Sequence, residues 1–107
     1  MNMITNDNIR SIIALAALQN VIDPEIGLNV VDLGLIYQLD FDEAEKRLYC
    51  TMTLTTQFCP MGESITDAAR EVLADAFPDY EIKIQLTFDP PWGHDRISDE
   101  GLKFLNI

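Results

Sequence analysis

The sequence predicts an α+β fold in which a three-stranded sheet carries its main helices on one face. Two kinds of pattern predict it: apolar residues at helical spacing in some stretches, and alternation of apolar and polar residues in others. Their order along the chain is helix, strand, strand, helix, strand, short helix. The length of 107 residues fits one compact domain, which we expect to span residues 1–107.

The first helix is expected from about Asn8 to Ile22, because apolar residues recur there at helical spacing. The residues that define this apolar face are Ile9, Ile12, Ile13 and Ala16, widened by Leu15 and Leu18. Asn6 or Asp7 is suited to cap its start. Asp23-Pro24 ends it, since the residue before a proline avoids the α region.

Two alternating runs around the polar turn 42–46 predict an antiparallel hairpin. The apolar positions of the two runs are Leu35, Tyr37, Leu39 and Phe41, then Leu48, Cys50, Met52 and Leu54. This alternation places Cys50 on the core side of the second strand.

The rest of the chain supplies two helices and the third strand. Residues 65–77 have the clearest helical pattern, which Phe77-Pro78 ends. Residues 81–88 alternate as a strand, and Pro90-Pro91 cannot continue it as a central strand. A short helix is expected from Ser98, its cap, to about Asn106.

The composition limits the classes of function. The formal net charge is −11, so phosphate backbones and anionic membranes are repelled, and a protein partner with a basic patch or a cation is favoured. The N-terminus lacks a signal-peptide pattern, and no apolar run is long enough to cross a bilayer. Two cysteines do not make a disulfide framework. We therefore expect a cytoplasmic protein.

The segment Thr55-Thr56-Gln57-Phe58-Cys59-Pro60-Met61-Gly62 stands between a predicted strand and a predicted helix. Pro60 fits the first helical position, which makes Cys59 the N-cap. The free N–H groups and the helix dipole at such a position favour the thiolate, the form that binds metals and attacks electrophiles. Thr55 and Thr56 bring hydroxyl donors, or are simply strand residues. The alternative for Cys59 is a small buried apolar residue.

Three other features carry possible chemistry. Asp23 and Glu25 can hold a hard cation, act as acid and base, or cap a turn. His94 is the only histidine and is either a base for Cys59 or a surface residue. Trp92 is either a lid over the cysteine or a core residue. One thiolate does not close a tetrahedral metal site within one chain.

Four motifs together resemble the SufT/PaaD-like family, which includes the targeting subunit of the eukaryotic cytosolic iron–sulfur assembly machinery. They are Asp23-Pro24-Glu25, then Val31-Asp32-Leu33-Gly34-Leu35-Ile36-Tyr37, then Thr55-Thr56-Gln57-Phe58-Cys59-Pro60, and finally Pro90-Pro91-Trp92 with Arg96-Ile97-Ser98. The resemblance runs from about Val21 to the C-terminus. One departure is Phe58, where many members have glycine, which adopts positive φ more easily.

The resemblance implies an accessory factor for iron–sulfur cluster assembly or delivery, without turnover of its own. Its partners would be the assembly machinery and client apoproteins, and its cargo a transient iron–sulfur cluster. The implied site comprises Asp23, Glu25, Thr55, Thr56 and Cys59, with Cys59 as the metal ligand. We expect these five residues to converge on one surface depression.

Three other functions stay open. One is a PaaD-like component of phenylacetate-CoA ring oxygenation, which the absence of further C-terminal cysteines disfavours. Another is a thiol enzyme with Cys59 as nucleophile. A third reading makes the chain an acidic adaptor in which the cysteine is incidental. Because a cluster is commonly held by four protein ligands, one chain needs a homodimer, small thiols or a partner protein to complete the set.

Overall fold

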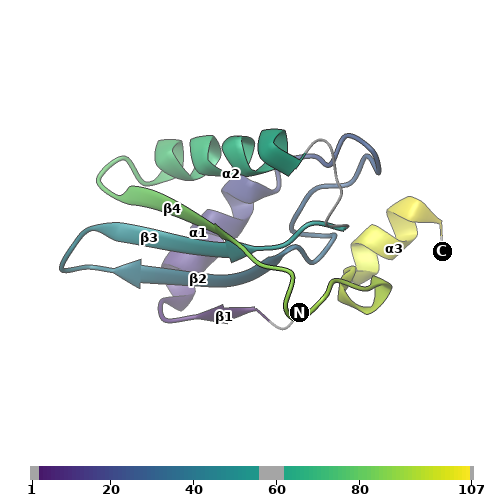
Figure 1. Cartoon of the computed structure of the whole chain (residues 1–107), viewed down its shortest axis with the longest axis horizontal. Coiled ribbons are helices and arrows are strands. Elements are labelled where there is room, and N and C mark those ends of the chain that lie inside the picture. Colours follow the sequence, from purple (N-terminus) through teal and green to yellow (C-terminus); the bar gives the residue numbers. More distant parts are fainter. Residues whose placement is uncertain (1–2, 56–61, 107) are drawn as a thin grey trace.

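A computed structural model describes residues 3–55 and 62–106. Its strands are β1 (Ile4–Thr5), β2 (Ile36–Asp42), β3 (Arg47–Met52) and β4 (Glu81–Leu86). Its helices are α1 (Asn8–Leu18), α2 (Gly62–Ala76), the 3₁₀ turn η1 (His94–Arg96) and α3 (Asp99–Leu105). Figure 1 shows α1 crossing behind the sheet, α2 running along it, and α3 beyond the strand ends.

The sheet has four strands in the order β1-β2-β3-β4, so the expectation of three strands is wrong. The missed strand is β1, which pairs in parallel with β2 through Ile4 and Gln38. Two residues are too few to show an alternating pattern, which explains why the sequence does not reveal it. The side chain of Asn6 secures this edge, since it exchanges two hydrogen bonds of 2.9 Å with the backbone of Phe41.

The predicted hairpin is confirmed. β2 and β3 pair antiparallel from Asp42 opposite Arg47 to Ile36 opposite Met52, and β4 joins β3 in parallel. The register shifts between Ile36 and Gln38, which makes Tyr37 the extra residue of a bulge. Tyr37 therefore leaves the core-facing series in which the alternation had placed it. It is buried elsewhere, with the Arg96 guanidinium 4.3 Å from its ring centroid.

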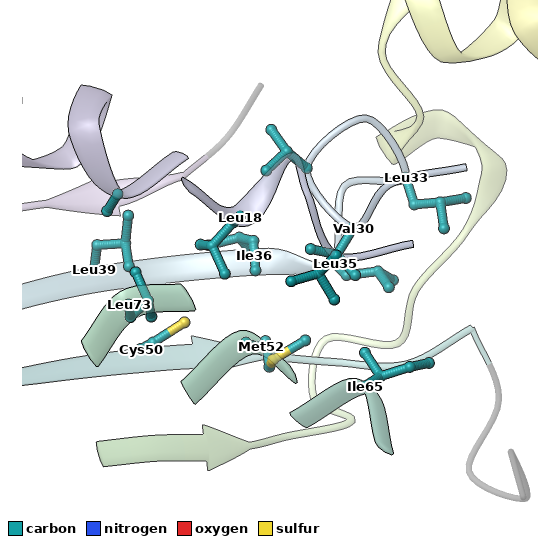
Figure 2. Close-up of a cluster of buried hydrophobic side chains, with 14 of the residues drawn as sticks. Leu18, Val30, Leu33, Leu35, Ile36, Leu39, Cys50, Met52, Ile65 and Leu73 are labelled. Atoms are coloured by element: carbon teal, nitrogen blue, oxygen red, sulfur yellow. The ribbon is translucent and has the colours of Figure 1, made fainter. Parts of the chain in front are cut away.

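The core forms between the inner face of the sheet and the helices α1 and α2. Strand residues Leu39, Leu48, Cys50 and Met52 meet helix residues such as Leu18 and Leu73, all fully buried. Figure 2 shows several of these side chains, with the sulfur atoms of Cys50 and Met52 inside the cluster. The prediction that Cys50 is a core residue is confirmed.

The first helix differs from its prediction in length and in orientation. α1 begins after its N-cap Asp7, as expected, but it ends at Leu18 rather than near Ile22. The chain leaves the helix early because Ile22 forms an antiparallel bridge with Asn29, and Val30 N donates to Val21 O at 3.0 Å.

The buried side of α1 consists of Ser11, Ala14 and Leu18. Ile9, Ile12 and Ile13 face solvent, which overturns the expectation that they pack on the core. The small side chains of Ser11 and Ala14 instead let this helix lie close to its neighbours.

The other elements match the sequence pattern closely. α2 ends at Ala76, next to the predicted stop at Phe77-Pro78. β4 ends at Leu86 rather than Phe88, where Thr87 and Asp89 form a turn through the Thr87 hydroxyl. Ser98 caps α3 by accepting a 3.0 Å hydrogen bond from Gly101 N.

Candidate functional site

The structure describes only part of the site that the sequence predicts. Asp23, Glu25 and Thr55 have defined positions, whereas Thr56 and Cys59 lie outside the described part of the chain. The interpretation of Cys59 as the N-cap of α2 therefore stays a prediction. What the structure defines is the frame around the cysteine segment.

The residues that flank the cysteine segment, residues 55–61, lie close together. Gly62 begins α2 and is buried, and a Cβ placed on it would lie 2.6 Å from Leu54 Cδ1. Leu54 follows β3 and is also buried. Leu54 and Gly62, the residues on either side of 55–61, therefore lie next to each other in the fold.

The loop that carries Asp23 and Glu25 is tied to the same end of the sheet. A chain of backbone hydrogen bonds runs from Thr53 N to Leu35 O (2.9 Å), from Leu35 N to Val30 O (3.0 Å) and from Val30 N to Val21 O (3.0 Å). Figure 1 shows this loop, between α1 and β2, at the end of the sheet where β3 ends and α2 begins. The loop that carries Asp23 and the described end of β3 therefore lie at one end of the domain.

Asp23 has a structural task at this position. Its side chain is 1% exposed, and its Oδ1 accepts hydrogen bonds from Glu25 N at 2.9 Å and Ile26 N at 3.4 Å. The turn closes with Gly27 N donating to Asp23 O at 2.7 Å, and Gly27 has a φ of 83°. Asp23 therefore shapes the turn, and Glu25, which is exposed, is the more accessible carboxylate of the pair.

A second set of contacts joins two motifs that are about sixty residues apart in sequence. Ser98 Oγ donates to Asp32 Oδ1 at 2.8 Å, and Trp92 Nε1 donates to Leu33 O at 2.6 Å. Tyr37 Oη donates to Pro90 O at 2.9 Å. These contacts fasten the segment after β4 onto β2 and the segment that leads into it.

The structure also places the two aromatic candidates. Trp92 is half-buried and bonded to the loop before β2, so it is a structural residue of this junction. His94 is exposed, and its ring centroid lies 5.4 Å from that of Trp92. Its position relative to Cys59 falls outside the described residues.

A pocket of about 470 Å³ opens at the same junction. Val31, Gly34 and Ile36 line one side, and residues 95–99 line the other. Asp23, Glu25 and Thr55 do not line it, so among the described residues this hollow is separate from the predicted site. The sequence does not reveal this pocket, because its two walls come from motifs that are far apart in the chain.

Of the two thiols, the structure describes the environment of Cys50. Cys50 is fully buried, and burial raises its pKa from 9.0 to about 12. Cys50 therefore stays protonated at neutral pH and is a poor nucleophile and a poor metal ligand. Residues 3–55 and 62–106 contain no cluster of three histidine, cysteine or acidic side chains suited to hold a metal ion. They also contain no helix long and apolar enough to cross a membrane.

The fold defines a class of small α+β domains. A crystal structure titled as a domain of unknown function, DUF59, from Bacillus anthracis has a TM-score of 0.82 at 37% sequence identity, and the match covers 88% of this chain and 89% of that one. A conserved hypothetical protein from Thermotoga maritima, TM0487, has a TM-score of 0.74 at 38% identity, covering 88% and 91%.

The sequence comparisons specify the family within this class. Residues 14–85 match the family described as "Iron-sulfur cluster assembly protein", and the chain belongs to it. It is 38% identical over 84 residues to the Fe-S protein maturation auxiliary factor YitW of Bacillus subtilis, covering 78% of this chain and 81% of that protein. It is 40% identical over 80 residues to the factor SufT of Staphylococcus aureus, covering 73% and 88%. The SufT-like resemblance is thereby confirmed.

Proposed function

We propose that this chain is an auxiliary factor in the maturation of iron–sulfur proteins and that Cys59 is the residue through which it handles its cargo. Family membership supports the role, and similarity to relatives named as maturation factors supports it further. The observation that carries the assignment to Cys59 is the burial of the other thiol. With Cys50 protonated in the core, Cys59 is the one cysteine of two that is a candidate thiolate.

The surroundings of the cysteine segment favour a binding role. The Leu54–Gly62 contact brings the ends of residues 55–61 together, and the hydrogen-bond chain from Thr53 to Val21 holds the Asp23 turn at the same end of the sheet. Glu25 and Thr55 supply oxygen atoms there. Oxygen ligands suit harder cations better than a sulfide-bridged cluster, so we expect them to assist iron rather than to replace sulfur ligands.

A cluster on this chain needs ligands from elsewhere. A cluster is commonly held by four protein ligands, and one candidate thiolate per chain leaves the set incomplete. The remaining ligands come from small thiols, from the assembly machinery or from the client. Incomplete ligation makes the cargo labile, which suits a factor that passes it on.

Anaerobic reconstitution with iron and sulfide tests the proposal. The wild-type protein is expected to take up iron and to lose it to a chelator, and Cys59→Ala is expected to take up none. Cys50→Ala is the matched control, because it removes a thiol of the same chain and is expected to keep iron binding. Equal iron in Cys59→Ala and wild type would remove Cys59 from the proposal and favour an adaptor role.

Labelling of Cys59 across pH separates this role from a thiol enzyme. A nucleophile activated by His94 requires a thiol pKa below the ordinary range, and His94→Ala would then raise it. Under the proposed role, His94→Ala leaves the labelling profile unchanged. A marked shift in that variant would favour the enzyme.

A further inference from the structure

The outward side of α1 is apolar. Ile9 is 76% exposed, Ile12 is 68% exposed and Ile13 is 49% exposed, and Ala16 is also exposed. These positions follow the i, i+3, i+4, i+7 spacing that places residues on one side of a helix. We call this set, Ile9, Ile12, Ile13 and Ala16, the isoleucine face. Large apolar side chains grouped in this way mark an interaction surface.

The charge of the chain indicates what kind of surface can meet this face. The chain has 18 acidic residues and a net charge of −11, yet α1 contains none of the acidic residues. Its only charged residue, Arg10, is paired with Asp7 and Glu43. Two copies of so acidic a protein repel each other over most surfaces. A contact between two isoleucine faces brings no carboxylates of the two α1 helices together, because α1 has none.

The shape of the face complements itself. If two α1 helices cross antiparallel about a two-fold axis between Ile12 and Ile13, Ile9 of each helix lies opposite Ala16 of the other. Each large side chain then meets a small one at the ends, and Ile12 meets Ile13 at the centre. An interface of this kind uses the same patch on both subunits, as a two-fold dimer requires.

We infer that a second copy of this chain covers the isoleucine face, so that the protein forms an antiparallel dimer through α1. The extent of the family match favours a second copy of this chain over a partner protein that all members of the family bind. It begins at residue 14, so Ile9, Ile12 and Ile13 precede it. A contact with shared assembly machinery would be expected within the shared part of the chain.

The arrangement has a consequence for the candidate site. The loop that carries Asp23 leaves from the C-terminal end of α1, and antiparallel helices place these ends on opposite sides. An 11-residue helix is roughly 16 Å long. The dimer therefore places the two Asp23 loops at opposite ends of the helix pair.

Sedimentation equilibrium tests the dimer directly. The wild type is expected to be dimeric at concentrations approaching about 1 mM, and more so at high salt, which screens the repulsion between acidic chains. Ile12→Glu is expected to be monomeric with an unchanged circular dichroism spectrum, and Ile9→Glu serves if that variant does not fold. Leu86→Glu is the control, because Leu86 is 47% exposed on β4, away from this face, and it is expected to stay dimeric.

Cross-linking tests the antiparallel register in a Cys59→Ala background. A mixture of Ile9→Cys and Ala16→Cys is expected to form the mixed disulfide in preference to either homodimer. Predominant homodimers would overturn the antiparallel arrangement. A wild-type monomer at every concentration, or a dimer that persists in both Ile12→Glu and Ile9→Glu, would overturn the inferred interface. None of these outcomes involves iron, so they are independent of the proposed function.

Discussion

Ser98 is joined to Asp32 by two hydrogen bonds of 2.8 Å, one from its hydroxyl to Asp32 Oδ1 and one from its backbone N–H to Asp32 O. The other carboxylate oxygen of Asp32 accepts from Asn29 Nδ2 at 2.7 Å. The same Ser98 hydroxyl accepts from Gly101 N and so caps α3. One aspartate thus fastens the C-terminal helix to the loop before β2.

Removing this aspartate is expected to destabilise the domain. Asp32→Ala leaves both Asn29 and Ser98 without their acceptor, so the free energy of unfolding is expected to fall by about 1–3 kcal/mol. Ser98→Ala also removes a helix cap, which is worth about 1 kcal/mol. A double-mutant cycle by urea unfolding is expected to give a coupling energy above ~0.5 kcal/mol. Additive losses would show that the two side chains act independently.

Two glycines with positive φ, Gly34 and Gly27, allow a matched test of how closely the same junction is packed. Gly34 has a φ of 77°, and a Cβ there would lie 2.1 Å from Arg96 O. Gly27 has a φ of 83°, with no neighbouring atom within 4 Å of such a Cβ. Both alanine variants carry backbone strain of about 1–2 kcal/mol, but only Gly34→Ala adds a clash with the backbone.

Thermal unfolding is therefore expected to show a much larger loss for Gly34→Ala than for Gly27→Ala. Separating two packed segments adds about 1–3 kcal/mol to the strain at Gly34. Equal losses in the two variants would contradict the close approach of Gly34 to Arg96.

The raised pKa of Cys50 predicts a pH dependence of stability at alkaline pH. Burial raises the pKa from 9.0 to about 12, so the unfolded chain loses this proton first. The thiol therefore leaves stability unchanged below pH 9.0 and lowers it as the pH rises toward about 12.

Urea unfolding of wild type and Cys50→Ala across this range isolates the effect. The wild type is expected to lose up to about 1.4 kcal/mol per pH unit more than the variant. The cavity in Cys50→Ala lowers its stability at every pH, so only the difference in slope is informative. Parallel slopes would show that Cys50 is accessible to solvent.

Substitutions at Asp23 separate its role in the turn from a role in binding. Asp23→Asn keeps an oxygen that accepts from Glu25 N, so its stability is expected to stay within about 0.5 kcal/mol, whereas Asp23→Ala is expected to lose about 1–3 kcal/mol. If Asp23 serves only the turn, Asp23→Asn also retains the iron uptake of the wild type. Iron loss in a stably folded Asp23→Asn would show that the negative charge itself is needed. Glu25→Gln, on an exposed residue, is the control for stability.

The sequence predicted those parts of the fold that depend on a short-range periodic pattern of apolar residues. The alternation of Leu48, Cys50 and Met52 identified the buried side of β3 because strand geometry fixes it. Helical periodicity located α1 but not its orientation, since the helix has two apolar sides and the smaller residues, Ser11 and Ala14, face the core. Periodicity measures where apolar residues group, and a surface that binds another chain gives the same signal as a core.

The residues of the candidate site were predicted from local chemistry and family resemblance. The contacts that hold the surrounding segments in place were not predicted. The motif at Asp32 and the motif at Ser98 were visible in the sequence as separate features. Their contact spans 66 residues, so only the tertiary structure reveals that they form one junction. The turn at Asp23 similarly needs the backbone hydrogen bonds to show that its carboxylate is engaged.

Cluster transfer to an apoprotein client is the most direct test of the proposed role. The measurement is the rate at which a client that requires an iron–sulfur cluster becomes active under anaerobic conditions, with iron, sulfide and a small thiol present. Under the proposed role, wild type and Cys50→Ala accelerate activation and Cys59→Ala does not. Equal acceleration by Cys59→Ala, or no acceleration by the wild type, would contradict the proposed role.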